Sequence, residues 1–251
     1  MSPSPVTMQK QSYLSRIYEN SAVFDTLSRY DPPPSPPFDL SQSYQVQKYL
    51  QSTDIIDWQH PAIVEQAHSL AVPYDLMATA RLCFTFVRDR IPHSCDFQLD
   101  PATCRASEVL LQGTGFCYAK SHLLAALLRA NGIPAGFCYQ RLSVNDHGPP
   151  YSLHGYNAVH LPQYGWYRVD ARGNKVGVDA QFAPPFEQLA FPLQTDAEYD
   201  FESILPEPLA CVVEALQVST DWRGVLANLP DIDPGAFESL RLKTRRRGNG
   251  E

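Results

Sequence analysis

The segment Gly113-Thr114-Gly115-Phe116-Cys117, which leads directly into residues 118–131, decides the fold of this chain. Within 118–131 apolar residues recur at spacings of three and four, which is typical of an amphipathic helix. Asn131-Gly132 and then Pro134 end that pattern. The sequence therefore predicts a helix that follows a glycine-rich turn and carries Cys117 at its N-terminus.

Two interpretations of Cys117 are open from this segment alone. A cysteine at a helix N-terminus lies near the positive end of the helix dipole, among N–H groups that have no helical partner. That environment favours the thiolate, which is the nucleophilic form. The alternative is a small apolar residue that starts a core helix, because single cysteines are commonly buried. Partners elsewhere in the chain decide between the two.

Residues 154–170 supply such partners. They are expected to form two strands, 154–161 and 165–170, joined by a Pro-Gln-Tyr-Gly turn. His154 begins the first strand and Asp170 ends the second, so an antiparallel hairpin makes them neighbours. A carboxylate there accepts a hydrogen bond from the imidazole and fixes its orientation. Cysteine, histidine and aspartate together are sufficient for covalent acyl transfer.

These pieces resemble the transglutaminase-like domains, a branch of the papain-like cysteine hydrolases and acyltransferases. The matching residues are Gly115-Phe116-Cys117, the helix end 127–135, His154 with its strand, and 161–170. The resemblance implies an α+β, papain-like fold with the cysteine-bearing helix packed on an antiparallel β-sheet. It also implies Cys117 as nucleophile, His154 as general base and acid, and Asp170 as the group that orients the histidine.

The chain departs from the family pattern at two positions. Ala158 stands where many members have an acidic residue, and Ala171 follows Asp170 where a proline is common. Neither change removes one of the three chemical groups. Both are expected to affect the substrate side of the site.

Further site residues are expected around this framework. An oxyanion needs hydrogen-bond donors, and the backbone N–H of Cys117 is one. Gln112 is a candidate for a second donor, with a polar helix cap as its alternative role. Tyr118, His147 and Tyr156 are candidates for substrate contact, although packing is the usual role of a tyrosine.

Two other histidines compete with His154 for the role of base. His160 lies on the same strand at an even spacing, so alternation does not separate the two. The resemblance and the distance to Asp170 in the sequence favour His154. His122 lies on the helix of Cys117, about 140° around it, and is expected to be a packing or surface residue.

The rest of the chain sets the domain boundaries. Residues 1–37 are an N-terminal extension with a proline-rich linker, 38–235 the catalytic domain, and 236–251 a basic tail that is expected to be disordered. Further helices are expected at 61–71, 75–91 with Asp75 as a cap, 107–111, 208–218 and 221–229. A strand is expected at 136–144, and a loop at 95–106.

Composition excludes several classes of function. The net charge is −7 and the pI is about 5.5, so we expect neither a nucleic-acid nor a membrane partner. No zinc-type Cys/His spacing or EF-hand loop occurs, so no metal or organic cofactor is expected. The N-terminal residues lack an apolar segment of the signal-peptide type, so we expect a cytoplasmic protein with free thiols. Nothing in the sequence indicates an oligomeric state.

The sequence thus predicts a cysteine enzyme that forms a thioester with an amide substrate, peptide or protein. It acts as a hydrolase or as a transglutaminase-type amidotransferase. The family resemblance implies that peptidase activity is favoured. The alternatives are a small-molecule acyl-transfer enzyme of a biosynthetic pathway and a binding module that retains the fold.

Overall fold

The computed structural model describes residues 46–145 and 148–237. The predicted extension 1–37 lies outside these residues, as does nearly all of the predicted tail 236–251, so both segments stay predictions. The helices are η1 (Lys48–Leu50), α4 (Pro61–Ser69), α5 (Leu76–Arg90), α6 (Ser94–Phe97), α7 (Ala106–Gln112), α8 (Cys117–Ala130), α9 (Ala210–Gln217) and α10 (Trp222–Ala227).

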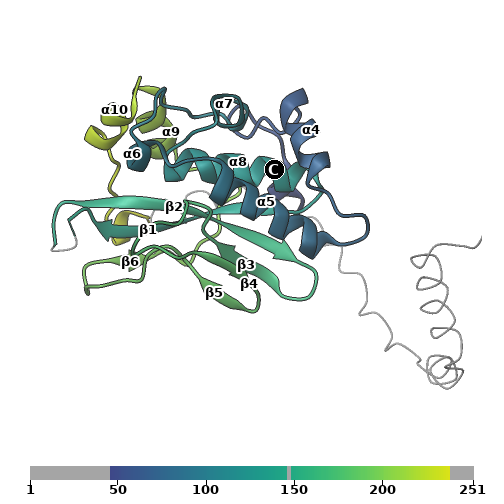
Figure 1. The fold of residues 1–251 in the computed structure, drawn as a ribbon. Helices are drawn as coiled ribbons and strands as arrows, with labels where there is room; N and C mark the ends of the chain where they lie inside the picture. Colours follow the sequence, from purple (N-terminus) through teal and green to yellow (C-terminus); the bar gives the residue numbers. More distant parts are fainter. Residues whose placement is uncertain (1–45, 146–147, 238–251) are drawn as a thin grey trace, which may run out of the picture. The chain divides into compact units, whose positions relative to one another are not determined.

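The strands form one main antiparallel sheet in the order β3-β2-β1-β6. Its strands are β1 (Ala135–Ser143), β2 (Tyr151–Leu161), β3 (Gly165–Val169) and β6 (Tyr199–Asp200). The separate hairpin of β4 (Gln181–Ala183) and β5 (Phe186–Gln188) completes the set. Strand β2 is central, with β1 on one side and β3 on the other, so residues of β2 are held from both sides (Figure 1).

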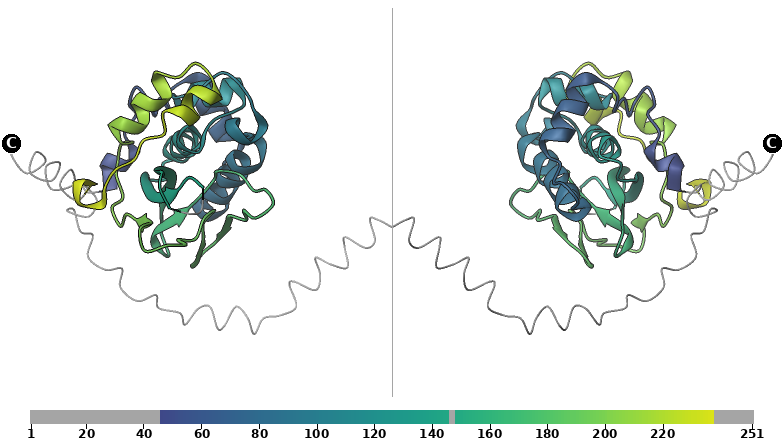
Figure 2. Two further views of the ribbon diagram at one scale, coloured as in Figure 1. Left: turned by 90° about the vertical axis from the view of Figure 1, so that its left-hand side faces the viewer. Right: turned by 90° about the vertical axis from the view of Figure 1, so that its right-hand side faces the viewer.

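Helix α8 forms the centre of the core. It packs on β1 and β2 with one side and on α4, α5 and α7 with the others, and the end-on views of Figure 2 show it enclosed by these elements. Every residue from Cys117 to Arg129 is buried. A helix that is buried along its whole length occupies the interior of the fold and not its surface. The predicted α+β fold, with the cysteine-bearing helix on an antiparallel sheet, is therefore confirmed.

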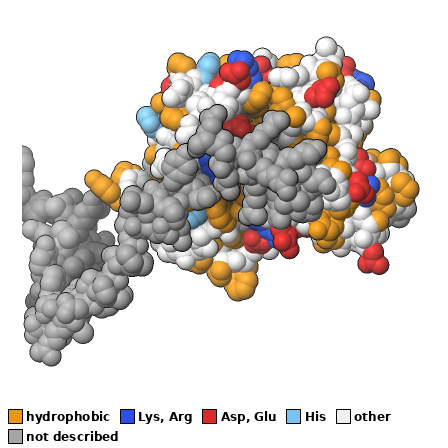
Figure 3. All heavy atoms as spheres, turned by 180° about the vertical axis from the view of Figure 1, so that it is seen from behind, with side chains coloured by type: hydrophobic (Ala, Val, Ile, Leu, Met, Phe, Trp, Pro, Cys, Tyr) orange, Lys and Arg blue, Asp and Glu red, His pale blue; other side chains and the backbone are white. Residues whose placement is uncertain are grey.

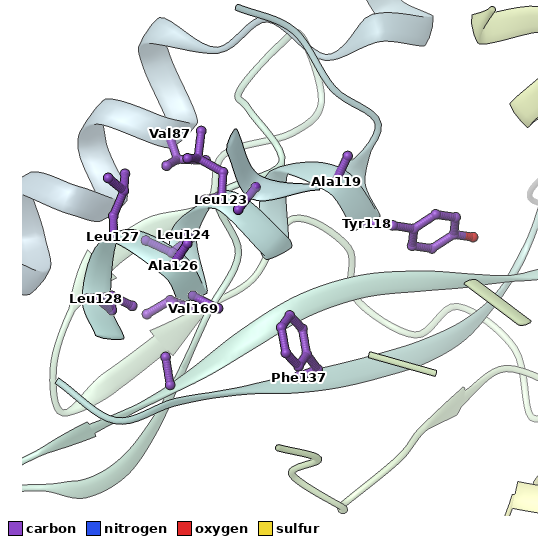
Figure 4. Close-up of a cluster of buried hydrophobic side chains, with 14 of the residues drawn as sticks. Val87, Tyr118, Ala119, Leu123, Leu124, Ala126, Leu127, Leu128, Phe137 and Val169 are labelled. Atoms are coloured by element: carbon purple, nitrogen blue, oxygen red, sulfur yellow. The ribbon is translucent and has the colours of Figure 1, made fainter. Parts of the chain in front are cut away.

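Apolar side chains of α8 contact the neighbouring helices on one side and the sheet on the other (Figure 4). Leu123, Leu124, Leu127 and Leu128 belong to one buried cluster with Val87 of α5, Phe137 of β1 and Val169 of β3. Each fully buried leucine contributes about 1.5–3 kcal/mol relative to an exposed one. This packing fixes the position of the N-terminus of α8, and with it the position of Cys117.

Most predicted elements occur within two or three residues of their expected bounds. Asp75 caps α5 as predicted, and its Oδ1 accepts the Ala78 N–H at 2.8 Å. Several short elements were not predicted, among them α6, which lies in the expected loop 95–106, and β6, which lies in the proline-rich stretch 183–208. These two are too short to give a periodic signal, and β6 exists through its pairing with β1.

The surface is mixed in character. On the face shown in Figure 3, acidic and basic side chains lie close together among hydrophobic ones. No helix in residues 46–145 and 148–237 has both the length and the apolar character needed to cross a membrane.

Candidate active site

The two glycines before Cys117 have different structural roles. Gly113 ends α7 with φ +67°, a left-handed conformation that glycine adopts without steric penalty. A Cβ at Gly115 would lie 3.2 Å from both Val109 Cγ1 and Ala119 Cβ. Gly113 therefore makes the predicted tight turn, whereas Gly115 allows α7 and α8 to approach closely.

The turn is hydrogen-bonded to Pro92 and to Ser94, the first residue of α6. The Ser94 N–H donates to the Gly115 carbonyl at 3.0 Å, and Thr114 Oγ1 donates to the Pro92 carbonyl at 3.0 Å. Phe116, the residue before α8, gives the helix no side-chain cap. The first N–H groups of α8, including that of Cys117, therefore have no side-chain acceptor and point toward the start of the helix.

His154 of β2 is held by a buried carboxylate. Its Nε2 lies 2.6 Å from Asp170 Oδ2. The other contacts of Asp170 are backbone N–H groups, from Arg172 to Oδ1 at 3.0 Å and from Ala190 to Oδ2 at 3.2 Å. The imidazole and the ring of Phe191 lie nearly perpendicular to each other, with the centroids 4.9 Å apart. The imidazole is thus fixed in orientation by Asp170 and Phe191, and Asp170 is fixed by two backbone N–H groups.

The charge states of His154 and Asp170 are set by the groups that surround them. Burial disfavours the imidazolium, but the Asp170 carboxylate and its hydrogen bond, together with Cys117, outweigh burial and raise the pKa of His154 to about 10. Burial works in the same way against the Asp170 carboxylate, but His154 and the two backbone N–H groups keep the pKa of Asp170 below its ordinary value. At neutral pH the pair is therefore an imidazolium and a carboxylate.

Cys117 and His154 line one cavity of about 620 Å³. The Cys117 side chain is close enough to His154 for a hydrogen bond that contributes to the raised pKa of the histidine. Since Asp170 occupies Nε2, Nδ1 is the ring nitrogen that remains for Cys117. The structure thus brings together the three residues that the sequence singled out.

Three of the other predicted site residues, Gln112, Tyr118 and Tyr156, do not line this cavity. Gln112 is exposed at the end of α7 and does not line the cavity, so the structure does not place it as an oxyanion donor. Tyr118 is fully buried over Gly155, and its hydroxyl donates to the Leu153 carbonyl. Tyr156 is buried and donates to Asp200 Oδ1 at 2.7 Å. Both tyrosines pack away from the cavity, and His147 lies outside the described residues.

The competing histidines lie elsewhere. His160 packs edge-on against Trp166, with the centroids 5.3 Å apart, and does not line the cavity. His122 is buried, and its Nδ1 lies 2.8 Å from the Cys104 carbonyl. In the described part of the chain no group of three or more His, Cys, Asp or Glu side chains is placed to hold a metal ion.

Sequence reasoning missed a second group of polar residues on the cavity wall. His93, Asp96, Arg172 and Lys175 all line the cavity. Arg172 and Lys175 both contact the Asp96 carboxylate, at 2.7 Å each. The one available signal was that Arg172 and Lys175 follow Asp170 closely in the chain. Asp96 precedes α8 in the sequence, whereas Arg172 and Lys175 follow it, so no local pattern predicts their contact.

Comparisons with known proteins gave one family match and several similar solved structures. Residues 65–171 match the family model of the transglutaminase-like superfamily. A search of curated proteins found no match. Similar solved structures include a protein from Cytophaga hutchinsonii named "putative cysteine protease", with 15% identity, a TM-score of 0.40, and coverage of 51% of this chain and 42% of that one.

Two further structures are similar. The periplasmic domain of TgpA from Pseudomonas aeruginosa has 21% identity and a TM-score of 0.34, with 51% of this chain and 49% of that chain covered. A structure named as a TGase has 12% identity and a TM-score of 0.34, with 68% and 41% covered. The matched region is thus less than half the length of each of the three chains. The family match shows that residues 65–171 of this chain belong to the transglutaminase-like superfamily.

Proposed function

We propose that the protein is a cysteine-dependent acyl-transfer enzyme with Cys117 as nucleophile, His154 as acid and base, and Asp170 as the positioning residue. The observation that carries this proposal is the shared cavity of Cys117 and His154, with His154 held by Asp170 at 2.6 Å. The superfamily membership of residues 65–171 supports it.

The mechanism starts from a thiolate and an imidazolium. Cys117 Sγ bonds to the carbonyl carbon of an amide, and the uncapped N–H groups at the start of α8 donate to the oxyanion. The C–N bond then breaks as His154 gives its proton to the departing amine. A thioester on Cys117 and a neutral imidazole remain.

The second half-reaction reverses the proton transfer. Neutral His154 takes a proton from water or from an acceptor amine, which attacks the thioester carbonyl. The C–S bond breaks, Cys117 leaves as the thiolate, and His154 is again the imidazolium. Water gives hydrolysis and an amine gives a new amide, so the same groups serve a peptidase and an amidotransferase.

The proposal is tested by alkylation with iodoacetamide at pH 6, where an ordinary thiol is almost wholly protonated and reacts slowly. Trypsin cleavage after Arg105 and Lys120 places Cys117 alone in one peptide, whereas Cys95 and Cys104 share another. Cys95 is the internal control, since burial and Asp96 raise the pKa of its thiol.

We expect fast alkylation of Cys117, slow alkylation of Cys95, and a loss of at least about 100-fold at Cys117 in His154→Ala. Cys117 alkylation as slow as that of Cys95, or unchanged in His154→Ala, would overturn the proposal and favour a binding module with the same fold.

A further inference from the structure

On the cavity wall, the group formed by Asp96, Arg172 and Lys175 carries an excess of positive charge. Arg172 makes two contacts with Asp96, Nη1 to Oδ2 at 2.7 Å and Nη2 to Oδ1 at 3.0 Å. Lys175 Nζ approaches Oδ1 of the same carboxylate at 2.7 Å. Two cations therefore share one carboxylate, which leaves one positive charge unbalanced within this group.

This charge lies next to the proposed nucleophile and is accessible. The guanidinium of Arg172 lies over the ring of Phe191, 5.4 Å from its centroid, and the same ring contacts His154. The Arg172 side chain is only 8% exposed, whereas that of Lys175 is 47% exposed. Arg172 is thus fixed in the wall, and the ammonium of Lys175 has protons available for a ligand.

His93 adds an unused polar group to the same wall. The residue is 5% exposed, and its buried Nδ1 has no hydrogen-bond partner among the described residues. The nearest carboxylate oxygen, Asp96 Oδ2, is 3.7 Å away. Burial and the charge of Arg172 hold the pKa of His93 well below its ordinary value, so the ring is neutral. A buried polar atom without a partner is rare and destabilising, and a bound ligand would satisfy it.

The remaining acid that lines the cavity does not compete for these cations. Glu198 accepts backbone N–H groups from Ser143 at 2.9 Å and from Thr195 at 3.2 Å, and a further one from Gln194. The Glu198 carboxylate is therefore already hydrogen-bonded to backbone N–H groups. The charge of Lys175 is therefore available to an anionic ligand that enters the cavity.

We propose that Lys175, Arg172 and His93 form a carboxylate-binding subsite, so that the substrate of Cys117 is an acyl compound or amide with a free carboxylate group. The proposal rests on the proposed function of Cys117. Charge-assisted hydrogen bonds from an ammonium and a guanidinium are the usual means of binding a carboxylate. The carboxylate belongs either to the acyl part or to the leaving group, and the two sources need separate probes.

The charge of the subsite is measured with two thiol reagents of opposite charge. These are 2-sulfonatoethyl and 2-(trimethylammonio)ethyl methanethiosulfonate, and the quantity is the ratio of their rates at Cys117, read in its tryptic peptide. Lys175→Met removes the accessible charge. Lys48→Met is the matched control, because Lys48 is exposed and does not line the cavity.

We expect the anion-to-cation ratio to fall about tenfold in Lys175→Met at low ionic strength, with a smaller fall at high salt. The ratio should stay at the wild-type value in Lys48→Met. Equal ratios in all three proteins would overturn the subsite. The ratio is measurable even where Cys117 reacts as slowly as an ordinary thiol, so a failure of the proposed function is distinguished from a failure of the subsite.

Two pairs of esters distinguish the sources of the carboxylate. Mono-4-nitrophenyl glutarate and its methyl ester differ in a carboxylate on the acyl part. 4-Acetoxybenzoate and its methyl ester differ in a carboxylate on the leaving group. We expect the KM of one acid to rise about tenfold in Lys175→Met, with no change for its ester or in Lys48→Met. A KM that is unchanged for both acids would overturn the proposal.

Discussion

The cavity wall around His154 and the interior around His122 bury the same kind of side chain, but His154 is charged there and His122 is neutral. His154 is 5% exposed and His122 is fully buried. The pKa of His154 is raised to about 10, whereas burial, with a further contribution from Arg129, lowers the pKa of His122 to about 4. Burial disfavours the charged ring in both places, so burial does not explain the difference.

The difference lies in the partner that each ring faces. His154 faces the Asp170 carboxylate, which carries a full charge and is itself held by backbone N–H groups. His122 faces the Cys104 carbonyl, which is neutral, and its Nε2 has no partner in the described residues. The Asp170 carboxylate, with a further contribution from Cys117, therefore makes a buried histidine a charged acid–base group.

The largest effect on the difference between the two histidines is expected for Asp170→Asn, which makes the surroundings of His154 resemble those of His122. The ring loses its counter-charge, and we expect the rate of Cys117 alkylation at pH 6 to fall by about 10²- to 10⁴-fold. Asp200→Asn is the matched control, since Asp200 accepts hydrogen bonds from Tyr156 and Arg168 and does not line the cavity. A similar fall in both variants would mean that Asp170 acts only through folding.

The two charge states are directly measurable by NMR titration of histidine ring signals in the intact protein. We expect the signal of His154 to show a charged ring up to about pH 10 and that of His122 a neutral ring down to about pH 4. In Asp170→Asn the midpoint of His154 should move down by several pH units. If both rings titrate near the ordinary value of 6.5, the proposed contrast is wrong.

Stability should respond to pH with opposite sign at the two sites. The folded pKa of His122 lies below the unfolded value, so its contribution is complete above about pH 6.5 and is lost as the pH falls toward 4, by about 3 kcal/mol. The folded pKa of His154 lies above the unfolded value, so its contribution is complete below about pH 6.5 and is lost as the pH rises through about 10.

Urea unfolding of wild type, His122→Gln and Asp170→Asn across this range tests the signs. His122→Gln should flatten the acid side, with a residual slope from His93, whose pKa is also lowered by burial. Asp170→Asn should reduce the slope on the alkaline side, with a residual slope from buried thiols such as Cys83, whose pKa burial raises to about 12. An acid side that is equally steep in wild type and His122→Gln would show that another group causes it.

The smallest effect is expected at Gln112, which is exposed on α7 and does not line the cavity. Gln112→Ala should change the free energy of unfolding by less than about 0.5 kcal/mol and the Cys117 alkylation rate by less than about twofold. A large loss of rate without a loss of stability would restore Gln112 as an oxyanion donor and contradict its placement outside the cavity.

Local sequence patterns determined a large part of this protein. The periodicity of 118–131 and the stop at Asn131-Gly132 predicted α8, and alternation with a turn at 162–165 predicted the β2–β3 hairpin. Because a hairpin joins neighbouring segments, the contact of His154 with Asp170 followed from spacing alone. The glycine turn before α8 likewise indicated Cys117, since a helix start is a local feature.

Only the tertiary structure decided what faces the cavity. The orientation of Gln112, Tyr118 and Tyr156 depends on how α7, α8 and β2 pack, and a sequence pattern does not show which side of a buried element a ligand approaches. The contact of Arg172 and Lys175 with Asp96 joins residues more than seventy positions apart. Such contacts form because the core brings distant segments together, and charge pairing at that distance leaves no periodic signal in the sequence.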